Sequence, residues 1–500
     1  MAAIITEKFR QSSATTFKNS FGTDKYYVFV GKSQPWTSEG AASDSLPPAP
    51  VDSVAPESYF WDDMLAAKLI ATSNTSFVIP RRDYSTSSAF DMYRHDVAGT
   101  TTTGNYPTKT TSSSGALTVY NSTYYFMTSA HRVYKVLYNG DPLQTGASNI
   151  SGAEPTSEVN NPFWHDANYY IKFMYKMTTS EIQNFLTTDF MSVTNTANSN
   201  AVRPINVVMV TSGGSGYPNG TFYTKVRGDG TTQAIVRLQV TGGAIQEFGN
   251  GSSFTNMQNA GVGYSFATVD LSTANIFSDA SASTAISGAT ATSWTNATAG
   301  SITPIIDPTG GHGANDIEEL GGHYVMVQGK FEPADSDATQ VNDFRRVGIV
   351  KNPLAGGSAA SVATARTTNA LIVSGTIGTN YQVDELITQA TTGARGRVVE
   401  WDATNKILYY VQEKYSSYGL DANGNLTAFS TNAAVTGSSS SASYSVATGT
   451  SSTVNGVVFS GGYASPELDR DSGEIIYVEN RRAISRASDQ TEDIKVVVEF

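Results

Sequence analysis

Apolar and polar residues alternate in several short segments of this chain, which is the two-residue period of a half-buried β-strand. The clearest case is the last segment, where Ile494, Val496, Val498 and Phe500 fall on one face. Similar patterns predict strands at 26–30, 77–80, 117–127, 131–138, 169–177 and 474–479. Burial of the four terminal side chains would contribute about 6 to 12 kcal/mol before entropy is subtracted. That amount is comparable with the net stability of a domain, so the terminal strand is expected to be essential.

Helical patterns are fewer. Residues 57–70 combine a broad apolar side with Asp62 and Asp63 on the other side, which predicts an amphipathic helix packed on a sheet. Residues 179–190 follow Thr178, whose hydroxyl can cap the first amides of a short helix. The remaining long stretches contain Gly, Ser, Asn and Pro at intervals typical of turns between strands.

Two regions differ in character from the rest of the chain. From 202 to 301, short apolar strands alternate with glycine pairs, and a tyrosine follows glycine at Tyr217 and Tyr264. Residues 280–301 are almost purely Ser, Ala, Thr and Gly, so we expect an exposed or weakly ordered connection there. The second region, 356–461, contains strand pairs around Thr-Gly-Ala turns and a Ser-rich tail, and it is expected to fold semi-independently as a small barrel-like unit.

Composition favours sheets and protein partners. Charged residues make up only 15% of the chain, while Tyr (26) and Phe (22) are frequent. The formal net charge of -12 argues against a footprint for nucleic acid or an anionic membrane. The chain has no cysteine, which excludes disulfides and thiolate metal sites. Neither a secretory signal nor a bilayer-spanning run is evident, so synthesis and assembly in a cytoplasm are expected.

Candidate chemistry is sparse. The glycine-rich turn around His312, together with Glu318, Glu319 and His323, could suggest zinc, but its spacing matches no zinc motif. A turn, a short helix and a strand at 324–328 are the expected structure. No pattern of a nucleophile and its base is present, so we predict no catalytic, cofactor-binding or metal-binding residues.

Two arginine pairs are the candidate partner-binding residues. Arg81 and Arg82 precede Asp83, and Arg481 and Arg482 follow the strand predicted at 474–479. Guanidinium groups form bidentate pairs with carboxylates. Such pairs could form within the fold or across a subunit boundary, and the sequence leaves both alternatives open.

Five sequence blocks resemble the baseplate wedge proteins of T-even-type contractile-tailed bacteriophages. They occur in the order of that family and contain Trp, Pro and Arg at fixed places: 29–36 (FVGKSQPW), 47–54 (PPAPVDSV), 78–84 (VIPRRDY), 342–354 (NDFRRVGIVKNPL) and the C-terminal 472–500. The resemblance covers roughly 1–195, 315–355 and 462–500, a little over half of the chain.

The resemblance implies a mainly β protein with a β-sandwich body, a few short helices and two inserted small β domains. The body would comprise 1–201, 302–355 and 462–500, and the insertions 202–301 and 356–461. The implied function is a non-enzymatic structural subunit, without cofactor, that bridges neighbouring wedge proteins and transmits rearrangement during tail contraction. The implied partners are other baseplate wedge proteins and a second copy in a homodimer, within the virion tail baseplate. The alternative is a receptor-binding or adhesive virion protein, because Gly-, Ser-, Thr- and Tyr-rich β modules also bind glycans.

Overall fold

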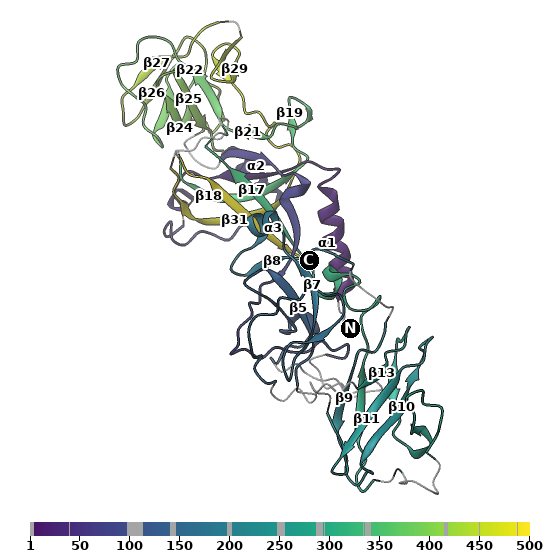
Figure 1. Cartoon of the computed structure of the whole chain (residues 1–500). Coiled ribbons are helices and arrows are strands. Elements are labelled where there is room, and N and C mark those ends of the chain that lie inside the picture. The colour runs from purple at the N-terminus through teal and green to yellow at the C-terminus, as the bar shows by residue number, and fades with distance from the viewer. Residues whose placement is uncertain are drawn as a thin grey trace. The chain divides into compact units, whose positions relative to one another are not determined.

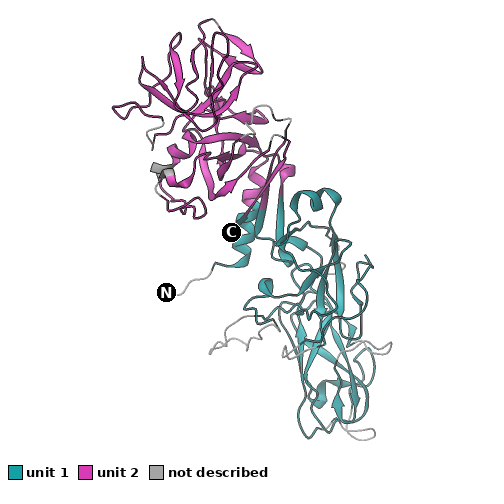
Figure 2. Ribbon diagram, turned by 90° about the vertical axis from the view of Figure 1, so that its left-hand side faces the viewer, with its two compact units in different colours: residues 1–15, 76–325, 498–500 teal, residues 16–75, 326–497 magenta. Residues whose placement is uncertain are grey.

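Strands dominate the computed structural model, so the predicted mainly β class is confirmed (Figure 1). The structure describes residues 5–39, 41–97, 114–140, 147–197, 203–247, 256–286, 294, 296–333, 335, 342–414, 419–449, 451–487 and 489–500. The chain forms two compact units (Figure 2). Unit 1 comprises residues 1–15, 76–325 and 498–500, and unit 2 comprises 16–75 and 326–497.

Helices are short in the described residues. The α-helices are α1 (Glu7–Ser20), α2 (Val54–Asp62), α3 (Thr179–Phe185) and α4 (Asp316–Glu319), and 3-10 turns occupy Trp36–Glu39, Thr72–Asn74, Val119–Asn121 and Thr273–Asn275. None of the described helices has the length and apolar character that crossing a bilayer would require.

The central sheet of unit 2 has five antiparallel strands. Their order across the sheet is β21 (Thr364–Arg366), β2 (Met64–Leu69), β1 (Tyr26–Gly31), β18 (Phe344–Lys351) and β31 (Glu474–Ile484). Every residue of β1 is buried, which explains its continuous apolar sequence. Phe29 lies over β18 at Gly348, where an added Cβ would lie 2.2 Å from the ring, so only glycine permits this packing.

The helix predicted at 57–70 is wrong in its second half. α2 ends at Asp62, and β2 begins at Met64 between β1 and β21. The first four residues of β2 are all buried, so apolar side chains fill both faces of the strand and no strand period shows in the sequence. Asp62 and Asp63, expected on a solvent-facing side, are 3% and 1% exposed. Strand pairing therefore overrides the helix preference of Met, Leu and Ala.

The predicted C-terminal strand is confirmed as β32 (Glu492–Glu499), the neighbour of β17 (Tyr324–Phe331). Ile494 and Val496 are buried, whereas Val498 and Phe500 are half-buried. The buried face thus contains two fully covered side chains instead of the four expected.

Unit 1 contains an aromatic-rich antiparallel sheet. It consists of β4 (Tyr125–Met127), β5 (Arg132–Tyr138), β7 (Tyr170–Lys176) and β6 (Phe163–Trp164), while β3 (Thr75–Pro80) pairs with β8 (Phe190–Ser192). The strand predicted at 117–127 is mostly wrong: only β4 forms, because Ser122 Oγ donates to Val119 O at 2.6 Å and closes a 3-10 turn.

The cap predicted for α3 is confirmed. Glu181 N donates to Thr178 Oγ1 at 3.3 Å, and Thr178 N donates to Glu181 Oε2 at 2.8 Å, which makes a complete capping box. The helix ends at Phe185 and not at the predicted residue 190, because Phe190 begins β8.

The region 203–305 forms sheets of its own within unit 1. β9 (Val207–Ser212) pairs with β16 (Ser301–Ile305), and β10 (Gly220–Gly228), β11 (Ile235–Thr241), β12 (Ala244–Ile245), β13 (Met257–Asn259), β14 (Ala267–Val269) and β15 (Ile276–Phe277) form the larger sheet. The expectation of an exposed connection at 280–301 is wrong for Trp294, which packs against Tyr217 and Phe222 and is 4% exposed. A single indole supplies the burial that the surrounding small residues lack; residues 287–293 and 295 lie outside the described residues.

The region 369–464 forms a seven-stranded sheet within unit 2. Its strands are β22 (Asn369–Ile372), β23 (Leu386–Gln389), β24 (Ala394–Asp402), β25 (Ile407–Val411), β26 (Ala434–Gly437), β27 (Ser443–Ser445) and β30 (Tyr463–Ala464). Two small hairpins accompany it, β19 (Leu354–Ala355) with β20 (Ser358–Ala359) and β28 (Ser452–Val454) with β29 (Val457–Phe459). The chain enters and leaves this region side by side, since Glu467 N donates to Arg366 O at 2.8 Å.

Candidate functional site

Arg81 and Asp83 pair with each other just after β3. Arg81 Nε lies 2.9 Å from Asp83 Oδ1, and Arg81 Nη1 donates to Thr187 O at 2.9 Å. The two side chains remain 29% and 55% exposed. A pair at this exposure contributes at most about 1 kcal/mol. The pair therefore orients the guanidinium but leaves part of both groups open to solvent.

Arg82 points elsewhere. Its guanidinium lies 4.3 Å from the ring centroid of Tyr125, and Nη2 donates to Asn121 O at 3.4 Å. Nη1 is buried and has no hydrogen-bond partner within the described residues. Arg82 thus supports the turn that precedes β4 by a cation–π contact, which no sequence spacing could have indicated.

Arg481 and Arg482 lie on β31, at the edge of the unit 2 sheet. Arg481 Nε lies 2.9 Å from Glu479 Oε1, and the arginine side chain is 46% exposed. Arg482 Nε donates to Ser45 O at 3.0 Å, and the buried Trp36 donates from Nε1 to Arg481 O at 2.6 Å. These contacts hold the loop before α2 against β31. The structure places the two predicted arginine pairs in different units and does not combine them into one site.

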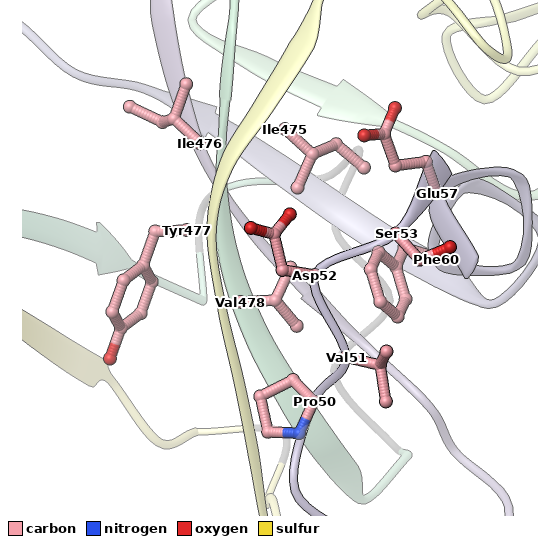
Figure 3. A pocket seen from close by; sticks show the side chains of 10 residues that line it. All are labelled: Pro50, Val51, Asp52, Ser53, Glu57, Phe60, Ile475, Ile476, Tyr477 and Val478. Atoms are coloured by element: carbon pink, nitrogen blue, oxygen red, sulfur yellow. The ribbon is translucent and has the colours of Figure 1, made fainter. Parts of the chain in front are cut away.

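A groove of about 290 Å³ lies beside the same strand. Figure 3 shows its walls: the loop that carries Val51 and Asp52, the α2 residues Glu57 and Phe60, and β31. Ile475 and Val478 of β31 pack against the core of unit 2 and form part of the groove's apolar surface. Sequence reasoning missed this groove, because its walls are more than 400 residues apart in the chain.

The histidines of the glycine-rich turn do not share a site. His312 Nε2 lies 3.1 Å from Asp307 Oδ1, whereas His323 Nδ1 contacts Glu7 of α1. No three His, Asp or Glu side chains converge in a metal-binding arrangement within the described part of the chain. The turn, the short helix α4 and the strand β17 follow each other as the sequence predicted.

A buried ion pair replaces the metal site that the motif could have suggested. Lys135 Nζ lies 2.8 Å from Glu319 Oε2, with side-chain exposures of 0% and 3%. Burial opposes ionisation of Glu319, but Lys135 and His312 outweigh it and lower the pKa of Glu319 to about 2. The carboxylate also accepts from Gly313 N at 2.7 Å. This pair fastens α4 to β5.

Asp316, in the same helix, has the opposite shift. Its Oδ2 accepts from Thr196 Oγ1 at 2.7 Å, while Oδ1 has no hydrogen-bond partner within the described residues. Burial raises the pKa of Asp316 from 3.8 to about 6. The Asp316 carboxyl group therefore binds its proton more tightly in the folded protein than in the unfolded chain. The resulting stabilisation is fully present below about pH 4 and is lost as the pH rises through about 6.

Asp316→Asn is expected to remove this pH dependence. Relative to the parent protein, the variant should gain about 1 to 3 kcal/mol in free energy of unfolding between pH 4 and pH 7, because the parent alone must ionise a buried acid. Urea unfolding at both pH values measures the difference. Asp189→Asn, on a surface loop of the same unit, serves as control and should change little at either pH. An equal effect of Asp316→Asn at both pH values would contradict the assignment.

Three further ion pairs connect distant segments of unit 2. Arg345 Nη2 lies 2.7 Å from Asp44 Oδ2, and its hydrogen bonds lower the pKa of Asp44. Arg346 pairs with the buried Asp63 at 2.5 Å.

Burial raises the pKa of Asp62, although Asp62 pairs with Arg470 and accepts from Lys414 N at 2.8 Å. Lys414 lies in the region 369–464, so this hydrogen bond connects that region to α2. The Arg-Arg dipeptide at 345–346 was part of a motif quoted above, but its partners could not be read from the sequence.

The comparisons with known proteins agree with the motif resemblance. Residues 3–129 match the Phage-Gp8 family, described as Bacteriophage T4, Gp8. A relative, the Baseplate wedge protein gp8 of Enterobacteria phage T4, is 33% identical over 122 residues, which cover 24% of this chain and 36% of the relative. The chain thus spans about a third of the length of the curated relative that it matches. The predicted resemblance to T4-like baseplate wedge proteins is confirmed over this stretch.

Proposed function

We propose that this protein is a structural subunit of a phage tail baseplate wedge, assembled in the host cytoplasm and located in the virion baseplate. The observation that carries the proposal is the match of residues 3–129 to the Gp8 family, whose T4 relative is named a baseplate wedge protein. The motifs at 342–354 and 472–500, beyond the matched stretch, resemble the same family and add support.

In this role the subunit is not an enzyme. It bridges neighbouring wedge proteins and keeps its own fold while they rearrange during tail contraction. The ion pairs Arg345–Asp44, Arg346–Asp63 and Arg470–Asp62 support such rigidity, because each joins segments far apart in the chain. Both side chains of the Arg346–Asp63 pair are buried, and breaking such a pair costs several kcal/mol. Deformation of the central sheet of unit 2 is therefore energetically unfavourable.

The exposed parts of the two arginine pairs would contact partner proteins. One of these partners would be a second copy of the chain, in a homodimer. Arg481 is 46% exposed, and the pair of Arg81 with Asp83 is partly exposed. Permanent interfaces bury about 2,000 Å² or more in total. Light scattering of the purified protein tests the dimer, and a monomer at micromolar concentration would contradict it.

Cryo-electron microscopy of the intact virion tests the location. The expected result is density in the baseplate that accommodates this chain. Absence of the chain from the baseplate, or binding of the purified protein to host cells or polysaccharide, would instead favour an adhesive virion protein.

We also propose the domain boundaries given above: a body of 1–201, 302–355 and 462–500 with insertions at 202–301 and 356–461. Separate cores support the insertions. Tyr264 and Trp294 belong to one apolar cluster, and Leu408 and Tyr410 belong to another.

Replacing residues 367–466 by a short linker of Gly and Asn is expected to leave the rest of the chain folded. Arg366 and Glu467 are already backbone partners, so a tight turn can join them. Asp62 loses Lys414 but keeps Arg470. Calorimetry should show the midpoint of thermal unfolding of the remaining chain within about 5 °C of the parent value. Extending the deletion to 363–466 should lower the midpoint further, because it also removes β21 from the central sheet. An unfolded product from the shorter deletion would contradict the proposal that this region folds as an insertion.

A further inference from the structure

The groove beside β31 combines an apolar surface with two carboxylates. Phe60, Ile475 and Val478 supply apolar surface, and Asp52 projects between β31 and α2 (Figure 3). Glu57 lies in the first turn of α2, on the same side of the groove as Phe60. The volume of the groove, about 290 Å³, can hold one or two side chains but not a large ligand.

Within the described part of the chain, the carboxylates of Asp52 and Glu57 have no charged or hydrogen-bonding partner. Both residues are exposed, and neither forms an ion pair or hydrogen bond with another described residue. Most acids around them are engaged: Asp44 with Arg345, Asp62 with Arg470 and Asp63 with Arg346. Asp52 and Glu57 therefore form a local negative site in a chain that already has a net charge of -12.

The groove also has an apolar rim. Val51 is 64% exposed and Ile476 is 41% exposed, and both line it. Single exposed apolar residues are ordinary, but a group of them around a hollow is typical of a contact surface. β31 is an edge strand, so part of its backbone can hydrogen-bond to an added extended segment.

We propose that this groove is an anchor pocket for an arginine or lysine side chain presented by an extended segment of a neighbouring protein. The aliphatic stem of such a side chain lies on apolar surface while its cationic head reaches the carboxylates. Val51, Phe60 and Val478 contact the stem, and Asp52 and Glu57 bind the head. The identification of the neighbour as a baseplate protein rests on the proposed function. The preference of the pocket for a cation is independent of that function.

Disulfide tethering tests the pocket on the full-length protein. Because the chain has no cysteine, Val51→Cys introduces a single thiol at the groove. The variant is equilibrated at physiological salt with an equimolar mixture of the symmetrical disulfides of cysteamine, mercaptoethanol and propanethiol, together with the three free thiols. The protein thiolate attacks one of these disulfides and releases one small thiol, and the mixed disulfides are quantified by intact-protein mass spectrometry. We expect the cysteamine adduct to be favoured about fivefold over the neutral adducts, which corresponds to one exposed to half-buried ion pair.

Matched controls distinguish binding of the cation in the groove from general attraction of cations to a negatively charged protein. Asp52→Asn with Glu57→Gln in the Val51→Cys background should abolish the preference. Thr188→Cys, beside the exposed Asp189, should show a preference of about twofold or less. If Val51→Cys does not fold, Ser53→Cys places the thiol at another lining position on the same loop.

Three outcomes would overturn the proposal: equal capture of cysteamine and mercaptoethanol, preferential capture of propanethiol, or a disulfide between two copies that outcompetes cysteamine. The last outcome would identify a second copy of this chain as the occupant. Failure of the cation preference leaves the baseplate assignment intact, whereas absence of the chain from the baseplate leaves the pocket chemistry intact.

Discussion

A chain that ends at Asp493 is expected to yield no soluble folded protein. Such a truncation removes most of β32, including the buried Ile494 and Val496, and exposes the edge of β17. The cost of losing two buried aliphatic side chains, about 2 to 5 kcal/mol each, approaches the net stability of a domain. An unpaired strand edge also promotes aggregation. Soluble yield and circular dichroism measure the result, and a truncated protein with parental thermal unfolding would contradict it.

A point substitution tests the contribution of β32 to stability quantitatively. Ile494→Ala is expected to lower the free energy of unfolding by about 2 to 5 kcal/mol, because the residue is 8% exposed and leaves a cavity. Val458→Ala in β29 is the control, since Val458 is 65% exposed and should contribute less than about 0.5 kcal/mol. Equal effects of the two substitutions in urea unfolding would show that β32 is peripheral.

The strands that the sequence predicted well share a local cause. In β1, β3, β5 and β7, apolar and aromatic residues are dense enough to mark a strand without knowledge of its neighbours. The prediction for β2 was wrong because its Met-Leu-Ala-Ala segment is buried on both faces, so apolar and polar residues do not alternate in the sequence. The prediction for Trp294 was wrong for a related reason. The composition of the surrounding segment predicted exposure, but the indole ring packs into a core formed by strands that are distant in the sequence.

Prediction of the candidate sites was limited by separation along the chain. Arg81 and Asp83 are two residues apart, so an acid beside the arginine was visible in the sequence. Arg346 and Asp63 are 283 residues apart, and only the pairing of β1 with β2 and β18 brings them together. The groove at Asp52 likewise depends on β31. Chemistry that depends on sheet register cannot be predicted from one sequence without the strand order.

Lys135→Met is expected to destabilise unit 1 by about 3 to 5 kcal/mol at pH 7. The substitution leaves the Glu319 carboxylate buried without its cation, and the cost of an unpaired buried charge is of this size. Arg132→Met is the matched control on the same strand, because its pair with Glu158 is partly exposed and contributes at most about 1 kcal/mol. Chemical unfolding measures both variants.

The double variant Lys135→Met with Glu319→Gln tests the pairing itself. Removing both charges should recover about 2 to 3 kcal/mol relative to Lys135→Met alone, since residue 319 then carries no buried charge without a cation. A double variant as unstable as Lys135→Met would show that the methionine disturbs packing against the Tyr93 ring, which lies 4.1 Å from Lys135 Nζ.

The pH dependence of Lys135→Met provides an independent readout of the pair. Burial works against ionisation of Glu319, yet Lys135 and His312 lower its pKa from 4.5 to about 2 in the folded protein. A depressed pKa contributes stability that is present above about pH 4.5 and is lost as the pH falls towards 2. The difference in free energy of unfolding between the parent and Lys135→Met should therefore be largest at pH 7 and shrink between pH 4.5 and pH 3. Carboxylates that the substitution leaves undisturbed titrate alike in both proteins and cancel in this difference. A constant difference across that range would mean that Lys135 stabilises β5 by packing alone.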